Sequence, residues 1–442
     1  MANQKTSVAK LAGKAWRKTL RRVFSLFPSH IRFAVYRSFV ECDPKPDERL
    51  VLKIAETKEE LEACFKLLHD AYVGEGYMKP APSGMRVTLY HALPTTTTLC
   101  AKVDGEVVGT ISLIRESVFG FPLQAIFDLT HVRERSGKIA EVSALAVHPR
   151  YRTTGGWILF PLMKFMYEYS ATFFDTRHLV IAVHPTRIEM YESLILFNRL
   201  TPKPIEGYDF ANGAPAVGAT LDLHEAPGRL KQVYGSKPRE KNLYDYFCKL
   251  KLRNIVIPGR RYFTTNDPVL TPALMDYFFN QQTDGFKNLD ERERVLLHSI
   301  YDLPEYKAIL PSLAPQAAGE HATRQHQRYS TKCPGHFEFN TSGTAETHEL
   351  RVIEFSSFGF LAHAKVLLPT NVWGQLTVQL GDKEHSSVKA MALRGKSSST
   401  GQRGFYAFKL LEPDVAWRKF VAALTSGKTH VDMDHATKFL PD

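Results

Sequence analysis

The sequence predicts an α/β domain followed by a small all-β barrel. Residues 50–200 alternate strand-like and helix-like patterns in the order β-α-β-β-β-α-β-α, which is typical of an α/β fold. Residues 334–411 hold six short strand-like runs separated by regular turn signals, which favours a closed barrel. The length of 442 residues is also greater than one ordinary domain needs. We therefore expect two folded domains with mixed chain between them.

Local signals define the elements of the α/β domain. Residues 51–55 form a short apolar run, and Thr57 and Glu60 then have the spacing of a capping box that opens a helix. Asp104 and Gly105 separate two strand-like runs, and this pair readily adopts the positive φ angles of a two-residue hairpin turn. The later elements are expected as a strand over 139–147, a helix from Gly155, a strand over 179–183 and a helix over 187–197.

The remainder of the chain divides by composition. Proline and glycine mark loops after residue 200, and residues 311–319 are rich in proline and alanine, as linkers are. A helix near 413–424 follows the last strand of the barrel. The expected units are a basic amphipathic helix (1–40), the α/β domain (41–200), a helical or irregular extension (201–310), a linker (311–320) and the barrel with its C-terminal helix (321–442).

The overall composition is that of a globular protein. The apolar fraction is 44% and the charged fraction 23%, so the chain is not mainly disordered. Its five cysteines are scattered and lack the spacing of metal ligands. This pattern argues against a disulfide framework and a zinc ribbon, and it suits a reducing cytoplasm. No run of 18 or more apolar residues is present, so we expect a cytoplasmic protein without a membrane-spanning helix.

Positive charge is concentrated at the N-terminus. Nine Lys or Arg and no Asp or Glu lie in residues 1–40, so this segment carries +9 of the net charge of +11. The other residues carry only +2, which argues against nucleic acid as a partner. Before Pro28, the basic residues fall on one side of a helix and the apolar residues on the other. Such a helix can lie on the anionic surface of the inner membrane, or it can pack on the adjacent domain with its charges in solvent.

A basic loop follows the strand expected over 139–147. Two arginines come after the end of this strand, and two glycines then open the next helix. Free N–H groups at a helix N-terminus attract anions, and glycine lets the backbone approach a ligand closely. The loop therefore suits a phosphodiester or a pyrophosphate, with an ordinary basic turn as the alternative. The candidate residues for binding such a group are Val147, Arg150, Arg152, Gly155 and Gly156.

This loop and a later segment resemble motifs A and B of the GNAT acyltransferase superfamily. Residues 145–155 read Leu-Ala-Val-His-Pro-Arg-Tyr-Arg-Thr-Thr-Gly, and residues 184–192 read His-Pro-Thr-Arg-Ile-Glu-Met-Tyr-Glu. The resemblance implies a GNAT-like fold that binds the phosphates of an acyl-phosphopantetheine donor at the first of these segments.

The same resemblance implies roles for single residues. Arg152, Gly155 and Gly156 would hold the donor's phosphates, and Tyr191 would protonate the leaving thiolate. The alternative for Tyr191 is packing between the last helix and the sheet. One departure is Trp157, which stands where the superfamily has a small residue. Its ring is expected to crowd the adenosine side of coenzyme A, which favours acyl carrier protein as the donor.

Further segments look like the N-acyl amino acid synthases of the FeeM type, which are relatives of the LuxI autoinducer synthases. They are residues 109–117, 120–127, 140–143 and 260–269, and the resemblance spans about residues 50–310. Both groups take acyl chains from acyl carrier protein, and Glu141 stands where they place a strand glutamate near the attacking amine. A carboxylate there can accept the amine's proton; the alternative is a structural acid paired with an arginine. LuxI enzymes have an arginine where this chain has Ala144, so homoserine lactone production is not implied.

Two short motifs near the barrel resemble those of a PilZ domain. Arg324 and Arg328 follow the linker, and Glu354, Ser356 and Gly359 lie between two expected strands. Guanidinium groups fork to phosphates and stack on purines, and a turn with an acid, a hydroxyl and a glycine can receive a guanine edge. The resemblance implies that these five residues bind cyclic di-GMP. Glu354 replaces the usual Asp or Asn, and a barrel that does not bind is the alternative.

Together these patterns predict a GNAT-like acyltransferase domain with a helical extension and a six-stranded PilZ barrel. The expected activity is transfer of a long-chain acyl group from the phosphopantetheine thioester of acyl carrier protein to an amino acid amine, under cyclic di-GMP control. Glu141 would deprotonate the amine, N–H groups near Val147 would hold the oxyanion and Tyr191 would protonate the sulfur, with no metal required. The alternatives are a non-catalytic scaffold whose barrel switches a partner interaction, and an enzyme that acylates a protein or polyamine from coenzyme A.

Overall fold

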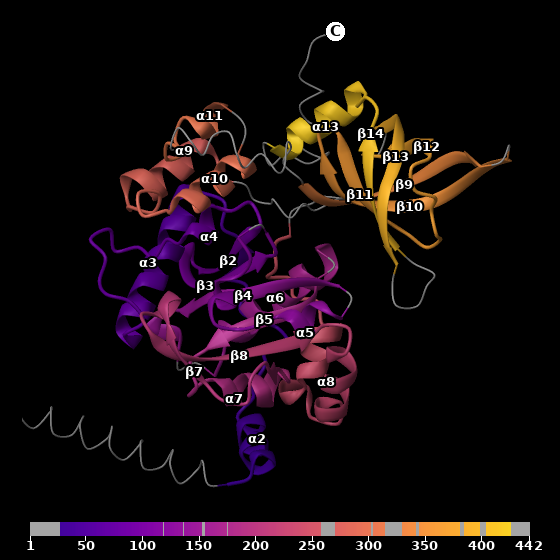
Figure 1. Cartoon of the computed structure of the whole chain (residues 1–442). Helices are drawn as coiled ribbons and strands as arrows, with labels where there is room; N and C mark the ends of the chain where they lie inside the picture. The colour runs from indigo at the N-terminus through magenta and orange to yellow at the C-terminus, as the bar shows by residue number, and fades with distance from the viewer. Residues whose placement is uncertain are drawn as a thin grey trace, which may run out of the picture.

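The computed structural model has a mixed α/β sheet domain and a closed β-barrel, so the predicted fold class is confirmed (Figure 1). It describes residues 27–117, 119–135, 137–152, 155–174, 176–257, 270–301, 304–313, 329–341, 344–380, 384–397 and 404–425. Most of the predicted basic N-terminal helix, residues 1–26, lies outside this part of the chain.

The α/β domain is built on one sheet of eight strands. The strand order is β1-β2-β3-β4-β5-β8-β6, and β7 pairs with β8 beside this path. Only the β4–β5 pair is parallel among the paired strands that the structure describes. The strands are β1 (Leu50–Ile54), β2 (Thr96–Val103), β3 (Glu106–Arg115), β4 (Lys138–Val147), β5 (Thr176–Val183), β6 (Asn198–Arg199), β7 (Ile205–Tyr208) and β8 (Ala214–Asp222).

Helices surround this sheet and continue into the extension. They are α2 (Ser29–Ser38), α3 (Lys58–Glu75), α4 (Leu89–Ala92), α5 (Thr130–Arg133), α6 (Leu159–Phe173), α7 (Ile188–Met190), α8 (Ala226–Tyr234), α9 (Pro272–Asp276), α10 (Glu291–Ile300) and α11 (Pro304–Lys307).

The local predictions for the start of the domain are confirmed. Asp104 and Gly105 have φ angles of 52° and 85°, and they join β2 to β3 in the predicted hairpin. The Thr57 hydroxyl accepts the N–H of Glu60, and the Glu60 side chain accepts the N–H of Thr57, so a capping box opens α3. The helix ends at Gly76, whose φ of 79° is that of a left-handed C-cap.

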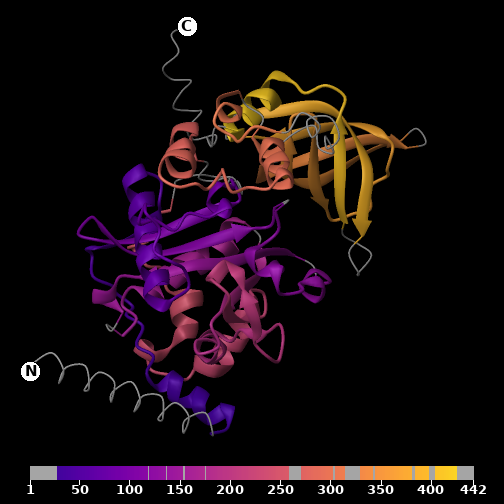
Figure 2. The same ribbon diagram turned by 60° about the vertical axis from the view of Figure 1, so that its left-hand side comes forward.

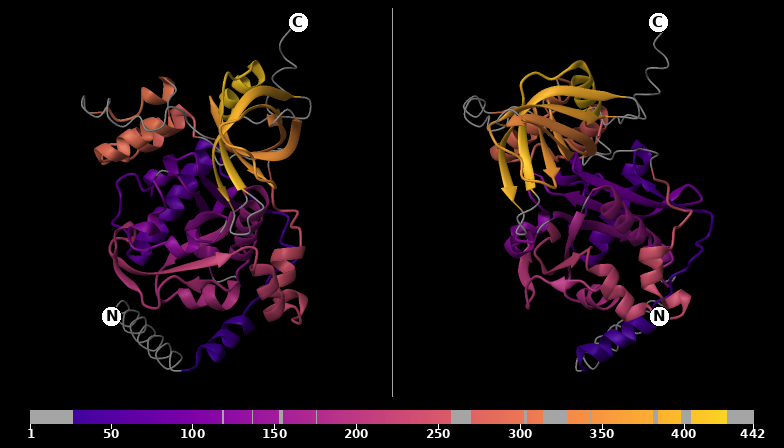
Figure 3. Two further views of the ribbon diagram at one scale, coloured as in Figure 1. Left: turned by 45° about the vertical axis from the view of Figure 1, so that its right-hand side comes forward. Right: turned by 90° about the vertical axis from the view of Figure 1, so that its right-hand side faces the viewer.

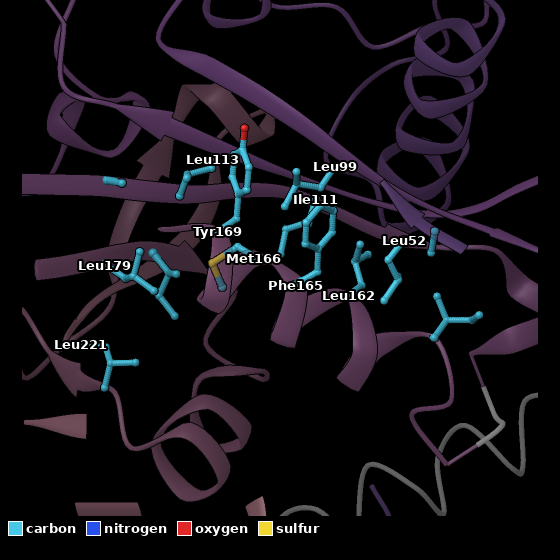
Figure 4. Packing of buried hydrophobic residues seen from close by; sticks show 14 of the residues in the cluster. Leu52, Leu99, Ile111, Leu113, Leu162, Phe165, Met166, Tyr169, Leu179 and Leu221 are labelled. Carbon is cyan, nitrogen blue, oxygen red and sulfur yellow. The ribbon is translucent and has the colours of Figure 1, made fainter. Parts of the chain in front are cut away.

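Helix α6 covers one face of the sheet. Figure 4 shows its Leu162, Phe165 and Tyr169 beside Leu52 and Ile111 of the strands, and all five side chains are buried. Removing each such side chain from water contributes about 1.5–3 kcal/mol. This packing fixes the start of α6 next to the end of β4, where the basic loop lies.

The opposite face carries α3 and the extension. Phe65 of α3 meets Phe278 edge-on, with 5.1 Å between the ring centroids. Both belong to one buried cluster with Ala144 of β4 and Leu297 of α10. The extension therefore packs on α3 as part of the same body, as Figure 2 shows for α9 and α10.

The predicted domain boundary at residue 200 is wrong. Strand β8 pairs with β5 over the whole register from Val217 to Asp222, so residues 201–222 belong to the sheet rather than to an extension. The short strands after residue 200 escaped prediction because their glycines and prolines resemble loop signals.

Two helix boundaries also differ from the prediction. Gly155 and Gly156 have φ angles of 64° and 92°, which a right-handed helix cannot contain, so α6 begins only at Leu159. The helix expected over 187–197 is the short α7 followed by a π-helical turn, Tyr191–Ile195.

The second domain is a closed barrel of six antiparallel strands in the order β10-β11-β14-β13-β12-β9 (Figure 3). Stacked rings of Phe360 and Phe408, 4.4 Å apart, help to fill its interior. Helix α13 (Val415–Thr425) packs on this core through Trp417, which is fully buried. The strands are β9 (Tyr329–Thr341), β10 (Thr344–Ser356), β11 (Gly359–Ala364), β12 (Trp373–Gln379), β13 (His385–Ser397) and β14 (Gly404–Leu410).

Helix α2 is the described remainder of the predicted N-terminal segment. It begins after Pro28, and Arg32 ties it to Glu189 of α7 at 2.6 Å. None of its residues is buried. Neither α2 nor any other helix within the described ranges combines the length and hydropathy that crossing a bilayer requires.

Candidate active site

The two central strands of the sheet separate halfway along their length. The parallel pairing of β4 with β5 runs from Lys138 to Glu141 and ends there. Beyond it, Ala144 has a φ of 54°, and the register between β3 and β4 shifts. This β-bulge turns the second half of β4 away from β5. The backbone of residues 142–147 therefore faces a gap instead of a neighbouring strand.

A cavity of about 530 Å³ occupies this gap. It is lined on the α3 side by Tyr72, Glu75 and Tyr77, and on the α6 side by apolar residues. Because α3 and α6 cover opposite faces, the cavity passes through the sheet between β4 and β5. The apolar residues on the α6 side are Leu159, Met163, Met166, Leu221, Ala226, Leu230 and Phe247.

Glu141 lies where the strands part, and its carboxylate is buried. The residue is 2% exposed and lines the cavity. One carboxylate oxygen accepts the N–H of Leu123 at 3.0 Å. No described arginine or lysine forms an ion pair with it, so the predicted alternative of an arginine partner finds no support in these residues. Burial without a cation raises the pKa of Glu141 to about 8.

Tyr191 lines the same cavity from the π-helical turn after α7. Its ring meets Phe197 edge-on, with 6.0 Å between the centroids. Burial raises the pKa of Tyr191 to about 12. The phenol is therefore protonated at neutral pH and can donate a proton. The ring also packs against its neighbours, which was the alternative role considered for Tyr191.

The basic loop lies at the end of β4. The Arg152 guanidinium donates to the Val147 carbonyl at 2.8 Å, and both residues line the cavity together with Gly156. A side chain at Gly156 would stand 2.5 Å from the Phe160 ring, so this position needs glycine. Arg150 and Gly155 are exposed and are not among the cavity-lining residues.

Trp157 lies beside the loop rather than in the cavity lining. Its ring stacks on Tyr151 with 5.6 Å between the centroids. The expected crowding of coenzyme A by this ring stays a prediction.

Several cavity residues were not predicted from the sequence. They include Tyr72, Glu75 and Tyr77 from α3 and the turn after it, and Arg187 before α7. Only Arg187 carried a usable signal, because it precedes Tyr191 by one helical turn.

The barrel holds the second predicted site in a tight hairpin. Ser356, the last residue of β10, pairs with Gly359, the first residue of β11, and its hydroxyl donates to the Gly359 carbonyl at 2.9 Å. A side chain at Gly359 would stand 2.6 Å from the Phe408 carbonyl, so only glycine fits there. The Trp417 indole donates to the Ser356 carbonyl at 2.9 Å and ties α13 to this hairpin.

The other parts of this second site are only partly described. Glu354 lies in β10 just after a register shift and is half-buried. Arg324 and Arg328 lie outside the described residues. Within the described ranges, no group of three or more His, Cys, Asp or Glu is placed to hold a metal ion.

Comparison with protein families identifies one match. The model of the N-acyl amino acid synthase FeeM family matches residues 63–222, which begin in α3 and end with β8. The match therefore covers β4 and β5, which border the gap, and both candidate catalytic residues, Glu141 and Tyr191. It supports an acyltransferase activity for this domain. None of the curated proteins compared with the chain matches it.

Solved structures of acyltransferases are also similar to the α/β domain. The N-acyl amino acid synthase FeeM from uncultured soil microbes is 23% identical, covers 41% of this chain and 94% of its own, and has a TM-score of 0.35. The acyl-homoserine lactone synthase LasI is 20% identical over 39% of this chain and 90% of its own, with a TM-score of 0.33. The coenzyme A-dependent acyl-homoserine lactone synthase BjaI is 19% identical over 45% of this chain and 98% of its own, also with a TM-score of 0.33.

The raised pKa of Glu141 predicts a pH-dependent stability. Between pH 4.5 and about 8 the folded state keeps a proton that the unfolded chain, in which this carboxyl has its ordinary pKa of 4.5, has already released. The free energy of unfolding should therefore fall with rising pH across this window, by up to about 1.4 kcal/mol per pH unit from this one group. Glu141→Gln should remove that fall, because the amide oxygen keeps the Leu123 bond without a charge.

Chemical denaturation of both proteins between pH 4 and 9 measures the difference. Glu116→Gln, which alters an exposed carboxylate paired with Arg133, is the matched control. Parallel stability curves for the wild type and Glu141→Gln would show that the carboxyl ionises normally in the folded protein.

Proposed function

We propose that this protein is a cyclic di-GMP-regulated N-acyltransferase that moves a long-chain acyl group from acyl carrier protein to the amine of an amino acid. The observation that carries the proposal is the buried carboxylate of Glu141, unpaired by any described cation, inside a cavity that crosses the sheet. The family match over residues 63–222 supports the same reaction class.

The reaction needs a base, an oxyanion site and an acid. The attacking amine forms a C–N bond to the thioester carbon and loses a proton, which Glu141 accepts in its ionised form. The backbone of residues 142–147, free of β5, offers N–H groups for the oxyanion. Collapse of the intermediate breaks the C–S bond, and Tyr191 protonates the leaving sulfur.

The shape of the cavity supports a long acyl chain. Its α6 side is lined by methionine, leucine and phenylalanine side chains, which favour a hydrocarbon over water. A short acyl group would leave this part of the cavity unfilled. The donor's phosphate belongs at the end of β4, near Arg152 and Gly156.

The choice of acyl carrier protein as donor rests on the loop. A carrier protein presents one phosphodiester, for which Arg152 and the N-terminus of α6 suffice. Coenzyme A adds an adenosine and further phosphates, which have to pass the stacked pair of Tyr151 and Trp157.

Mass spectrometry of products tests the activity. The purified chain should convert hexadecanoyl-acyl carrier protein and a mixture of amino acids into N-acyl amino acids, and use hexadecanoyl-coenzyme A more slowly. Tyr191→Phe should lower the rate by about 100-fold or more through loss of the acid. Tyr277→Phe, which removes a phenol bonded to Glu62 outside the cavity, should have no effect.

Two results would contradict the proposed activity or the proposed donor. The absence of any N-acyl product would favour a scaffold. Equal saturation by both donors would defeat the argument from Trp157 and favour coenzyme A.

For the barrel, we propose cyclic di-GMP as the ligand. The support is the closed six-stranded barrel together with the hairpin in which Ser356 and Gly359 are held by the bond between them and by Trp417. Such a fixed turn can receive a guanine edge beside Glu354. Arg324 and Arg328 would then supply the charge for the phosphates.

Calorimetric titration with cyclic di-GMP tests the barrel. The double substitution Arg324→Ala/Arg328→Ala should weaken binding by about 100-fold or more, since two charge-assisted contacts are lost. The matched control is Arg17→Ala/Arg21→Ala, an arginine pair with the same spacing elsewhere in the chain. Equal heats from the wild type and the Arg324/Arg328 variant would remove the assignment.

We further propose that α2 and the basic segment before it bind the inner membrane. An apolar stripe with a spacing of four residues is exposed there: Phe27, Ile31, Val35 and Phe39 are 46%, 40%, 37% and 77% exposed. The segment before α2, residues 1–26, carries seven Lys or Arg and no acid. Apolar side chains beside a positive segment fit an anionic bilayer.

Vesicle sedimentation tests this surface. Ile31→Ser/Val35→Ser/Phe39→Ser should reduce binding to vesicles of phosphatidylcholine and phosphatidylglycerol by about tenfold or more, through lost apolar burial. Val366→Ser/Leu367→Ser, which alters an exposed apolar pair of the barrel, is the control. Sedimentation that is unchanged by the triple substitution would exclude α2 as the membrane contact.

A further inference from the structure

The rim of the cavity on the α3 side carries an ion pair across its mouth. Arg187, just before α7, lies 3.7 Å from the carboxylate of Glu75, the last residue of α3. Both residues line the cavity, and their side chains are 59% and 47% exposed. The pair therefore joins the end of α3 to the start of the segment that carries Tyr191, at the edge of the cavity.

Aromatic contacts hold this rim in place. Tyr77 meets Tyr72 edge-on at 5.9 Å and stacks on His184 at 6.0 Å, which links the turn after α3 to the loop after β5. Burial raises the pKa of Tyr77 and of Tyr191, and the Arg187 charge opposes the rise in both. The guanidinium is thus close to the phenol proposed as the acid.

Few cations are available to an anionic acceptor group. Of the described residues that line the cavity, none is a lysine, and the arginines are Arg152 and Arg187. The Arg152 guanidinium, whose Nε donates to the Val147 carbonyl, is assigned to the donor's phosphate in the proposed function. A carboxylate that arrives with the acceptor amine therefore has Arg187 as its partner.

We propose that Arg187 and Glu75 form the acceptor-recognition site and select a free α-amino acid, with Arg187 binding its carboxylate. This rests on the proposed function and adds to it the residues that recognise the acceptor. Amino acids carry a carboxylate next to an ammonium, which is the charge pattern opposite to that of the pair.

The resting ion pair is weak enough to be exchanged. A separation of 3.7 Å between half-exposed side chains exceeds hydrogen-bond length, and such pairs contribute about 0–1 kcal/mol. A substrate carboxylate can bind the guanidinium through two parallel hydrogen bonds and displace Glu75 from it. The displaced Glu75 then remains as an anion beside the incoming ammonium. Amides, esters and polyamines lack the carboxylate, so they cannot displace Glu75 and they gain no contact with Arg187.

Steady-state kinetics with matched acceptors tests this site. For each amino acid that is acylated, the wild type should prefer the free acid to its primary amide by about tenfold or more in kcat/KM. Arg187→Ala should raise KM for the acid and bring this ratio close to one, while Arg187→Lys should keep part of it. Arg133→Ala, which breaks an Arg–Glu pair outside the cavity, should leave the ratio unchanged.

The outcomes separate this inference from the proposed function. Acids and amides used equally well by the wild type, or a preference that survives in Arg187→Ala, would overturn the site and leave the acyltransferase intact. If no amine is acylated, the proposed function fails. Saturation-transfer NMR with amino acids and amides then decides the site: carboxylate-dependent binding that Arg187→Ala abolishes supports it, and its absence overturns it.

Discussion

The separation of β4 from β5 is the feature on which the chemistry of this protein depends. In a continuous sheet the backbone groups of β4 would be consumed by hydrogen bonds to β5, and strands about 4.8 Å apart would leave no room for a ligand between them. The bulge at Ala144 prevents this, and the parallel pairing ends at Glu141. The result is a passage through the sheet, bordered on one side by the backbone of residues 142–147, which pairs with β3 but not with β5. The clusters above and below, on α6 and on α3, keep the strands apart without closing the passage.

Burial at this point gives two side chains their chemical character. Glu141 sits inside the sheet layer and accepts the N–H of Leu123, and burial raises its pKa to about 8. Tyr191 reaches the same cavity from a π-helical turn, a form of helix that places side chains differently from an ordinary α-helix. A base with a pKa near neutrality and a protonated phenol suit the two proton transfers of amide formation.

The segment that carries Tyr191 is also where other parts of the molecule meet. Helix α2 is bound to it by the ion pair of Arg32 with Glu189 and by the bond from Arg37 to the Ser193 carbonyl. The proposed membrane surface and the proposed acceptor site thus attach to one short stretch of chain. The proposed control by the barrel requires a change in the arrangement of the two domains. A ligand changes activity only if it favours one arrangement of the two domains over another.

The sequence alone determined the elements that depend on neighbours in the chain. The Asp104-Gly105 turn, the capping box at Thr57 and the six strands of the barrel need only local φ preferences and alternation of apolar residues, and all three are confirmed. The basic loop and the position of Glu141 in a strand were readable for the same reason. Tertiary structure decided the rest. Whether Glu141 has a cation beside it, where β8 joins the sheet and which residues of α3 face Arg187 all depend on contacts between segments far apart in sequence. Such contacts follow from packing in three dimensions, which no local pattern of residues encodes.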